Sequence, residues 1–178
     1  MRYHTPNSFE DAARLAAQAQ GVVRFLAGGT DVLVQLRTGG VTPDDLIDIK
    51  HIPGVHDITQ TPEGGWRIVA AVSGAEMGEH AALRGDWPGV VEAMELVGST
   101  QVQGRATLAG NLCNASPAAD SVPALVAAGA VASVLGPDGA REVAVAEIPA
   151  GPGATTLAKG ETSAAITLPP REAGGAGA

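Results

Sequence analysis

Apolar positions at helical spacing mark the first element of the chain. Within residues 8–21, small apolar side chains recur on one face of a helix. Ser8, followed three residues later by Asp11, resembles a capping box at the start of this helix, and Gly21 is the expected stop. The apolar face consists of Phe9, Ala12, Ala13, Ala16 and Ala19.

Two short apolar runs then flank a second helix. Residues 22–26 (VVRFL) and 46–49 (LIDI) are predicted to be strands. Between them, residues 32–37 (VLVQLR) predict a short helix that ends at the Gly39–Gly40 pair. The stretch up to residue 53 is therefore predicted to be a small β-α-β lobe. The apolar side of its second helix consists of Val32, Leu33 and Leu36.

Downstream of Pro53 the pattern changes to hairpins and helices. Two apolar segments flank PEGG and two flank GPDG, both typical hairpin turns. Helices are predicted from Ser73 to about Leu83, from Pro88 to Gly98, and from a cap at Asp120 to residue 129. The hairpin strands are expected at residues 56–61, 66–72, 130–135 and 141–148, and a last strand at 164–168.

Seven strands mixed with five helices predict an α+β fold instead of a doubly wound sheet. We expect residues 1–53 to form a small N-terminal lobe and residues 54–170 a second α+β lobe. The end of the chain, residues 171–178 (REAGGAGA), has the composition of a flexible tail.

Composition and charge narrow the possible functions. The 178 residues are 45% hydrophobic and 17% charged, which fits a compact folded protein. A net charge of −8 argues against a general nucleic-acid binder, and it predicts that backbone N–H groups hold any phosphate-bearing ligand. No apolar run approaches the ~20 residues of a membrane span, and no signal peptide is seen at the start, so a cytoplasmic location is expected.

Cysteine and histidine usage predicts no metal site. Cys113 is the only cysteine, so neither an internal disulfide nor an iron–sulfur cluster with four thiolates can form within the chain. The four histidines show no metal-binding spacing. No nucleophile–base pair is evident, and no catalytic residue is predicted.

The first candidate binding loop is LAGGTD, residues 26–31. A strand leads into two glycines and then into a helix, which directs bare N–H groups at one point. Gly28 and Gly29 leave room for an anion there. The alternative is an ordinary glycine turn that joins a strand to a helix.

The second candidate loop is ATLAGNLCNASPAAD, residues 106–120. Thr107 and Asn111 offer hydrogen bonds to a sugar-phosphate chain, and Asp120 can accept one from a ribose hydroxyl. The alternative is a long surface loop whose Asn and Asp residues cap turns. Together the two loops suit a dinucleotide whose pyrophosphate is held from two sides.

Four motifs in order resemble the FAD subunit of the molybdenum hydroxylases, a family that includes xanthine dehydrogenase, carbon monoxide dehydrogenase and hydroxybenzoyl-coenzyme A reductase. The motifs are LAGGTDVLVQLR, LIDI, QVQGRATLAGNLCNASPAADSVPAL and GPDGAREV. The resemblance implies a two-lobed flavin fold of the PCMH type, which is like that of vanillyl-alcohol oxidase, with FAD between the lobes. It also implies partner subunits: a large one with molybdopterin and a small one with 2Fe-2S clusters.

The resemblance also implies which residues bind FAD. The first segment would hold the cofactor from one side and the second from the other, with Asp120 on the adenosine side and Val97 in the flavin cleft. Ser163 would make a lesser contact. The full set is Leu26, Ala27, Gly28, Gly29, Thr30, Asp31, Val32, Leu33, Val97, Thr107, Leu108, Ala109, Gly110, Asn111, Asp120 and Ser163.

The chain departs from the family pattern at three places. Ala109 stands where a glycine is usual, and Gln103 and Gly104 replace a common Arg-Asn pair. Family members usually continue into a further C-terminal domain, which is expected to be absent here.

The function that the resemblance implies is electron transfer from iron–sulfur clusters through FAD to a terminal acceptor, with no oxidation of substrate by this chain alone. Two alternatives stay open. One is a structural subunit that no longer binds FAD, and the other is a free-standing flavin oxidoreductase of the same fold.

Overall fold

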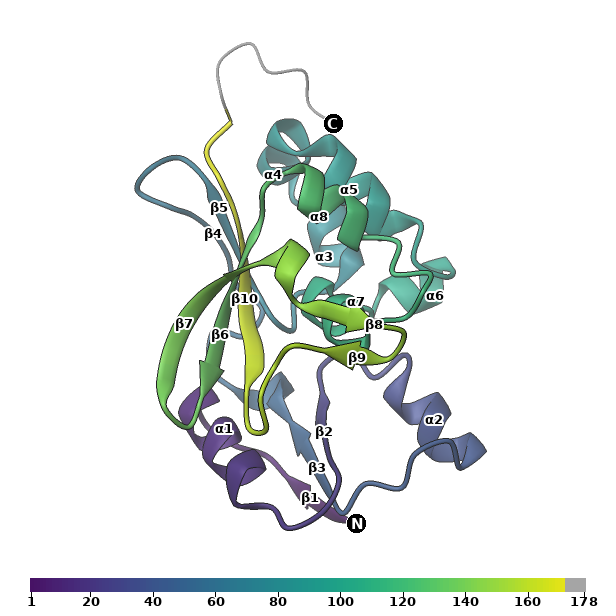
Figure 1. Ribbon diagram of the computed structural model, residues 1–178. Coiled ribbons are helices and arrows are strands. Elements are labelled where there is room, and N and C mark those ends of the chain that lie inside the picture. The colour runs from purple at the N-terminus through teal and green to yellow at the C-terminus, as the bar shows by residue number, and fades with distance from the viewer. Residues whose placement is uncertain (172–178) are drawn as a thin grey trace.

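Two larger β-sheets and one two-stranded sheet organise the chain in the computed structural model, which describes residues 1–171 (Figure 1). A three-stranded sheet has the order β1-β3-β2, a five-stranded sheet has the order β4-β5-β10-β6-β7, and β8 pairs with β9. The mixture of sheets and helices confirms the α+β class. Except for Arg171, the predicted flexible tail lies outside the described residues. The strands are β1 (Arg2–His4), β2 (Val23–Leu26), β3 (Asp45–Asp48), β4 (Ile58–Gln60), β5 (Trp66–Val69), β6 (Val131–Gly136), β7 (Gly139–Ala144), β8 (Pro149–Gly151), β9 (Ala154–Thr155) and β10 (Thr162–Leu168).

Eight α-helices and two 3-10 turns connect the strands in the described part of the chain. None of these helices is long and apolar enough to cross a membrane. They are α1 (Phe9–Gln18), α2 (Val32–Thr38), η1 (Ile49–His51), α3 (Gly74–Glu79), α4 (Ala81–Asp86), α5 (Pro88–Glu95), α6 (Thr100–Gln103), α7 (Leu108–Asn114), α8 (Val122–Ala127) and η2 (Val145–Glu147).

The first sheet confirms the predicted β-α-β unit and adds one strand to it. Strands β1 and β2 both pair in parallel with β3, which is buried along its whole length. Strand β1 was not predicted, because its three residues, Arg-Tyr-His, carry no apolar alternation. Polar contacts to β3 hold β1 in place instead.

Two buried carboxylates of β3 make those contacts. Asp45 accepts hydrogen bonds from Arg2 at 2.8 and 2.7 Å and lies 2.7 Å from the His4 ring nitrogen. The Arg2 and His4 bonds lower the pKa of Asp45 from 3.8 to about 2. Burial alone would raise the pKa of Asp48, but hydrogen bonds from Lys50 and Tyr3 outweigh it, so that pKa also lies below its ordinary value.

Helix α1 starts as predicted and ends earlier. The Ser8 hydroxyl accepts the Asp11 N–H at 3.1 Å, whereas the Asp11 carboxylate binds Arg14, so only half of the capping box forms. The helix ends at Gln18, and Gly21 is not its stop. A Cβ at Gly21 would lie 1.8 Å from the Asp44 carboxylate, so a larger residue there would displace that side chain from its bond to the Val22 N–H.

The second sheet confirms both hairpins and the last strand. Strands β4 and β5 pair antiparallel, as do β6 and β7. Strand β10 lies between β5 and β6 and is almost wholly buried. It begins at Thr162, two residues before the predicted start.

The helices on one side of this sheet correct three predicted boundaries. The helix expected from Ser73 to Leu83 is two helices, because His80 ends α3 and its Nδ1 accepts the Leu83 N–H of α4 at 3.1 Å. Helix α5 ends at Glu95, before Gly98. Helix α8 has Ser121 as its N-cap residue, so Asp120 does not cap it.

The largest correction concerns residues 106–120, which were predicted to be a loop but contain α7. Helix α6 lies just before them, in a stretch for which the sequence predicted no element. Thr107 caps α7 by accepting the Gly110 N–H at 2.9 Å, and Leu108 and Leu112 lie one turn apart on its buried side. Glycine and asparagine between these leucines hid the helical pattern.

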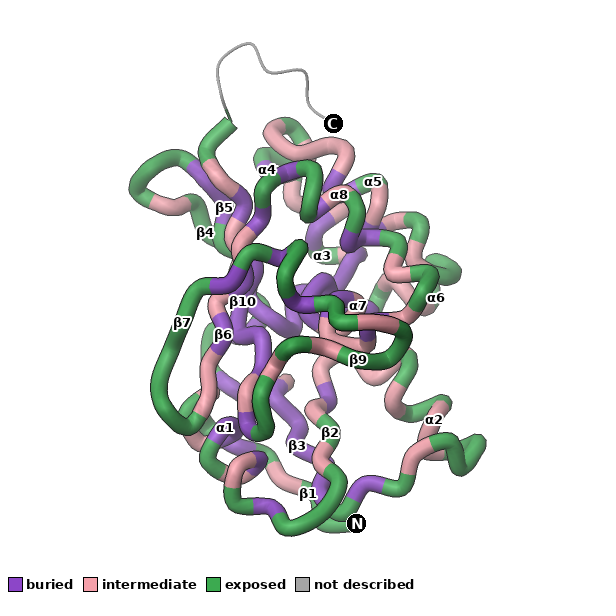
Figure 2. The backbone as a smooth tube through the Cα atoms, viewed as in Figure 1, coloured by how far each residue is buried: buried purple, intermediate pink, exposed green. Residues whose placement is uncertain are grey.

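Two hydrophobic clusters fill the interior, and the purple segments of Figure 2 trace them. The larger cluster lies between the five-stranded sheet and helices α3, α5, α7 and α8. The smaller joins α1 and β3 to residues 69–71 and Ala109. Residues of both proposed lobes therefore share the smaller core, and the division at residue 53 stays a prediction.

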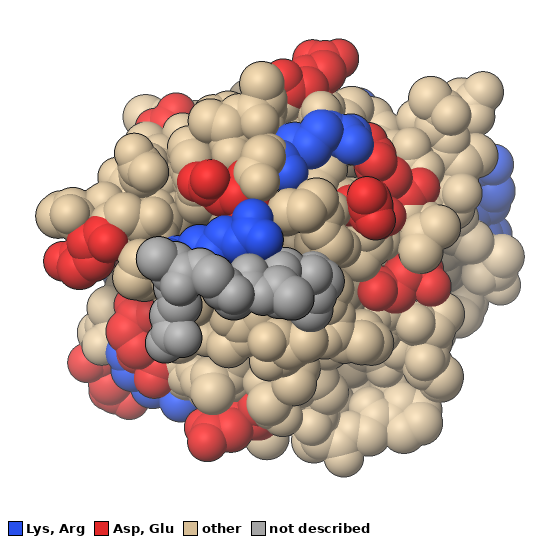
Figure 3. Space-filling view, turned by 90° about the horizontal axis from the view of Figure 1, so that it is seen from above, with Lys and Arg blue, Asp and Glu red and all other residues tan. Residues whose placement is uncertain are grey.

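Acidic side chains outnumber basic ones, 19 to 11. Figure 3 shows them spread around the face that is seen from above. Most of the Lys and Arg side chains visible on this face lie near acidic ones.

We predict that Asp45→Asn flattens the acid dependence of stability. A carboxylate with a lowered pKa stabilises the fold above its unfolded pKa, and this contribution is lost as the pH falls from 3.8 to about 2. Urea unfolding across this interval should show a smaller loss of stability for the variant than for the wild type. An equal loss in both proteins would contradict the role given to Asp45.

Candidate functional site

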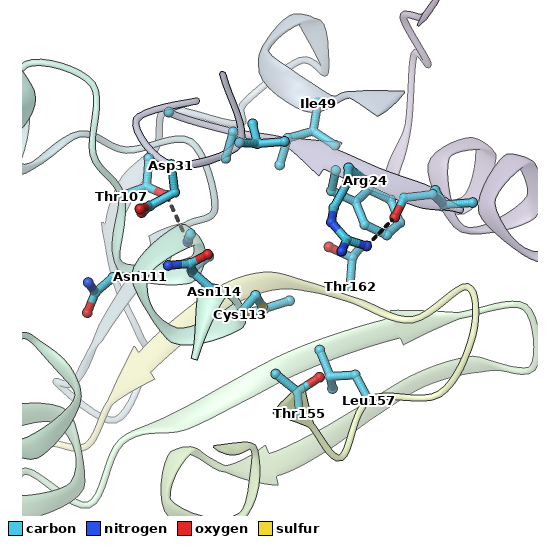
Figure 4. Close-up of a pocket in the computed structure, with 18 of the residues that line it drawn as sticks. Arg24, Asp31, Ile49, Thr107, Asn111, Cys113, Asn114, Thr155, Leu157 and Thr162 are labelled. Carbon is cyan, nitrogen blue, oxygen red and sulfur yellow. Dashed lines mark hydrogen bonds between the residues drawn. The ribbon is translucent and has the colours of Figure 1, made fainter. Parts of the chain in front are cut away.

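A cleft of about 650 Å³ brings together the two loops that the sequence singled out (Figure 4). Residues of the first loop line one wall, and residues of α7 and the turn before it line another. A third wall, which the sequence did not predict apart from Ser163, consists of residues 153, 155 and 157–163. Segments far apart in the chain therefore form one site.

The first loop enters α2 without a side-chain cap. Gly29 has a φ of +81°, a left-handed conformation that favours glycine, and the chain turns there from β2 toward α2. Asp31 precedes α2, but its side chain accepts no hydrogen bond from the first turn of that helix. The first turn of α2 therefore lacks the side-chain cap that Ser8 provides for α1 and Ser73 for α3.

Gly28 is required by the protein itself. A Cβ at this position would lie 1.9 Å from the Arg105 carbonyl oxygen, so the backbones of the two loops touch here. The Arg105 Nε also donates to the Gly28 carbonyl oxygen at 3.4 Å. From the sequence, we expected the missing side chain at Gly28 to make room for an anion. In the structure, the space that a side chain would take is filled by the backbone of the second loop.

The second segment is held rigidly by its own side chains. Asn111 Oδ1 accepts the Ser121 hydroxyl at 2.7 Å, which ties α7 to the start of α8. Ala109 lies within α7 and is not among the positive-φ residues, so the backbone there accommodates a methyl group at the position where the resemblance implies a glycine. The Gln35 side chain donates to Asn114 at 3.3 Å and links α2 to α7 across the cleft.

Polar contacts fasten the third wall. The Gly153 N–H donates to the Ala115 carbonyl oxygen at 2.8 Å, and Lys159 Nζ donates to the Ala19 carbonyl oxygen at 2.5 Å. The Glu161 carboxylate binds Arg141 at 2.7 and 2.8 Å. Sequence reasoning missed this wall because only its position beside β10 brings it to the cleft. The glycine-rich run GPGATTLAKGE was the one available signal.

Twelve of the sixteen predicted site residues line the cleft, and four do not. Leu26 and Leu108 are buried in the protein, and Leu33 and Asp120 are exposed. Their contacts with a cofactor stay predictions. The twelve are Ala27, Gly28, Gly29, Thr30, Asp31, Val32, Val97, Thr107, Ala109, Gly110, Asn111 and Ser163.

Cys113 also lines the cleft, but it is not a nucleophile. Burial raises the pKa of its thiol to about 11, so the thiol is protonated at neutral pH. Among the described residues, no group of three His, Cys, Asp or Glu side chains is placed to hold a metal ion. The site is suited to holding a ligand by shape and hydrogen bonds.

A dinucleotide fits this arrangement. The cleft volume of about 650 Å³ lies within the roughly 300–1,000 Å³ of small-molecule sites. Its walls consist largely of glycine, alanine, threonine and asparagine, which let a ligand approach the backbone closely. Gly29, Thr30, Asp31 and Val32, at the start of α2, line the cleft, and Asp31 makes no side-chain cap there.

Comparison with known proteins identifies relatives along nearly the whole chain. Residues 1–171 match the family described as "FAD binding domain in molybdopterin dehydrogenase". The chain is 30% identical over 169 residues to the xanthine dehydrogenase FAD-binding subunit of Escherichia coli O157:H7, covering 95% of this chain and 58% of the relative. It is 31% identical over 172 residues to the carbon monoxide dehydrogenase medium chain of Afipia carboxidovorans, covering 94% and 58%.

Solved structures of carbon monoxide dehydrogenases have the same fold as this chain. Carbon monoxide dehydrogenase from Oligotropha carboxidovorans superimposes with a TM-score of 0.91 at 28% identity, over 97% of this chain and 60% of that one. The enzyme from Hydrogenophaga pseudoflava gives a TM-score of 0.92 at 28% identity, over 98% and 60%. The chain thus spans about three-fifths of the length of the relatives that it matches.

We predict that Gly28→Ala separates the two loops and destabilises the protein by about 1–3 kcal/mol, the range for overpacking. Gly85→Ala is the matched control, because no atom lies within 4 Å of a Cβ there and the residue is in α4. Urea unfolding should show a lower free energy of unfolding for Gly28→Ala than for the wild type, and no decrease for Gly85→Ala. Equal stability of the two variants would mean that the loops do not need this contact.

Proposed function

This chain belongs to the family of FAD-binding domains in molybdopterin dehydrogenases, and we propose that it binds FAD in the cleft between its two glycine-containing segments. One observation carries this proposal: the two motifs, about 80 residues apart in sequence, touch at Gly28 and Arg105 and line one cleft. Bound FAD would supply the redox chemistry, which is the transfer of electrons one or two at a time.

The residues of the chain would bind and orient the cofactor. Gly29, Thr30 and Asp31 line the cleft, and their backbone N–H groups would suit the pyrophosphate. Val32 and Val97 supply apolar contacts for the flavin ring. The protonated Cys113 thiol adds no charge beside the ring.

We further propose that the chain is the electron-transfer subunit of a larger oxidoreductase. Its relatives are named as subunits or chains of dehydrogenases. The partners would be a large subunit with molybdopterin and a small subunit with 2Fe-2S clusters, because a single cysteine cannot ligate such a cluster here. Electrons would enter from the clusters and leave to a terminal acceptor.

We predict that filling the cleft blocks FAD binding. Thr155 lines the cleft, whereas its neighbour Ala154 on the same strand is exposed and does not. Thr155→Trp should weaken FAD binding at least about tenfold in titrations that follow flavin fluorescence, because the indole would occupy cofactor volume. Ala154→Trp should bind FAD like the wild type. Wild-type protein that binds no FAD would support the structural-subunit alternative.

We also predict that substrates do not reduce the flavin in the isolated chain. Xanthine, an aldehyde and carbon monoxide, the substrates for which relatives are named, should leave the flavin absorbance unchanged without oxygen. Dithionite should bleach it. Bleaching by one of the three substrates would favour a free-standing oxidoreductase.

A further inference from the structure

One wall of the cleft is a largely exposed segment of ten residues. Residues 151–160, here called the strap, run between Ile148, which is fully buried, and the buried start of β10 at Thr162. Six residues of the strap are exposed, and only Gly160 is buried. Segments with few buried contacts open at a low free-energy cost, so the strap can move without disturbing either of the two larger sheets.

The strap faces the first loop across the cleft. Thr155 and residues 157–160 of the strap line the cleft. Figure 4 shows Thr155 and Leu157 on the opposite side of the cleft from Asp31. A ligand in the cleft therefore lies between the strap and the first loop.

Most contacts of the strap are made with the second half of the chain. The Thr156 N–H donates to the Ile148 carbonyl oxygen, and the Thr156 hydroxyl donates to the Glu147 carbonyl oxygen, both at 2.8 Å. The bond to Ala115 and the packing of Leu157 on the larger hydrophobic cluster add two more contacts. These contacts hold the base of the strap and do not close it onto the first loop.

One bond joins the strap to the N-terminal part of the chain. Lys159 Nζ donates to the Ala19 carbonyl oxygen at 2.5 Å, and within residues 1–171 this is the one hydrogen bond between the strap and residues 1–53. Helix α1 ends at Gln18, and its last turn contains no basic side chain. The last carbonyl groups of a helix lack partners within it and favour a nearby cation. Lys159 supplies both the donor and the charge from 140 residues away.

Gly160 fits the strap closely onto the same helix. Its φ is +90°, a conformation that favours glycine. A Cβ there would lie 3.0 Å from the Ala17 Cβ and 3.3 Å from the Ala13 carbonyl oxygen. Because this contact is made by small groups, the strap can separate from α1 once the Lys159 bond breaks.

We propose that the strap is a gate on the cleft, which opens for FAD to enter and leave, and that Lys159 latches it onto α1. This inference rests on the proposed function, because it takes FAD as the ligand of the cleft. Lys159 is a positioning residue, since its ammonium group is committed to Ala19 and acts on the cofactor through the strap. Loss of the latch raises the population of the open strap and so speeds the passage of FAD in both directions.

The test compares Lys159→Met with Arg67→Met, which removes the same charge from an exposed position on β5 outside the lining of the cleft. Association and dissociation of FAD are followed by stopped-flow flavin fluorescence in the full chain. Lys159→Met should speed both about tenfold, as expected for loss of one hydrogen bond to a charged group, so that Kd changes by less than about threefold. Lys159→Arg keeps a donor for the Ala19 carbonyl group and should restore slow exchange, and Arg67→Met should match the wild type.

The other outcomes separate the possible errors. Faster dissociation with unchanged association would mean that Lys159 binds FAD directly, and it would overturn the gate. A lower midpoint of thermal unfolding with unchanged FAD rates would assign Lys159 to stability alone and overturn the inference, while the proposed function would stand. Equal acceleration in Arg67→Met would overturn it as well. Wild-type protein that binds no FAD would overturn both the inference and the proposed function.

Discussion

The contact between the backbones at Gly28 and Arg105 is the constraint on which the site depends. Any side chain at position 28 would occupy the space of the Arg105 carbonyl group, so the two loops can meet only if glycine stands there. Because the loops touch, α2 and α7 lie on either side of one cleft. The hydrogen bond between Gln35 and Asn114 links these two helices directly. The third wall is held by hydrogen bonds to the carbonyl oxygens of Ala19 and Ala115.

The sequence predicted the elements with strong apolar patterns and missed those without them. Both hairpins, β10 and the first two helices follow from alternation, turn residues and a serine cap. Strand β1 could not be found, because buried carboxylates at Asp45 and Asp48 hold it in place of apolar packing. Helix α7 was missed because its turn-forming residues outnumber its two leucines. The break at His80 depends on a side-chain cap, which periodicity cannot reveal.

The site was predictable where it follows a local motif. The glycine loop and the segment around Thr107 meet as expected. Glycine is required at position 28, however, by the contact with the Arg105 backbone. The third wall carries no motif, and only the tertiary arrangement brings it to the cleft. Asp120 shows the converse: it lies in a recognisable motif but outside the lining of the cleft. Sequence therefore located the centre of the site and left its ends to be found in the structure.

The central claim is that FAD occupies this one cleft. Hydrogen–deuterium exchange of the chain with and without FAD tests it most directly, because bound cofactor slows exchange of the N–H groups that it contacts. The account predicts slower exchange in three separate segments, residues 28–32, 108–111 and 155–163, and no change in β1 or β7. Protection confined to other segments, or none at saturating FAD, would contradict it.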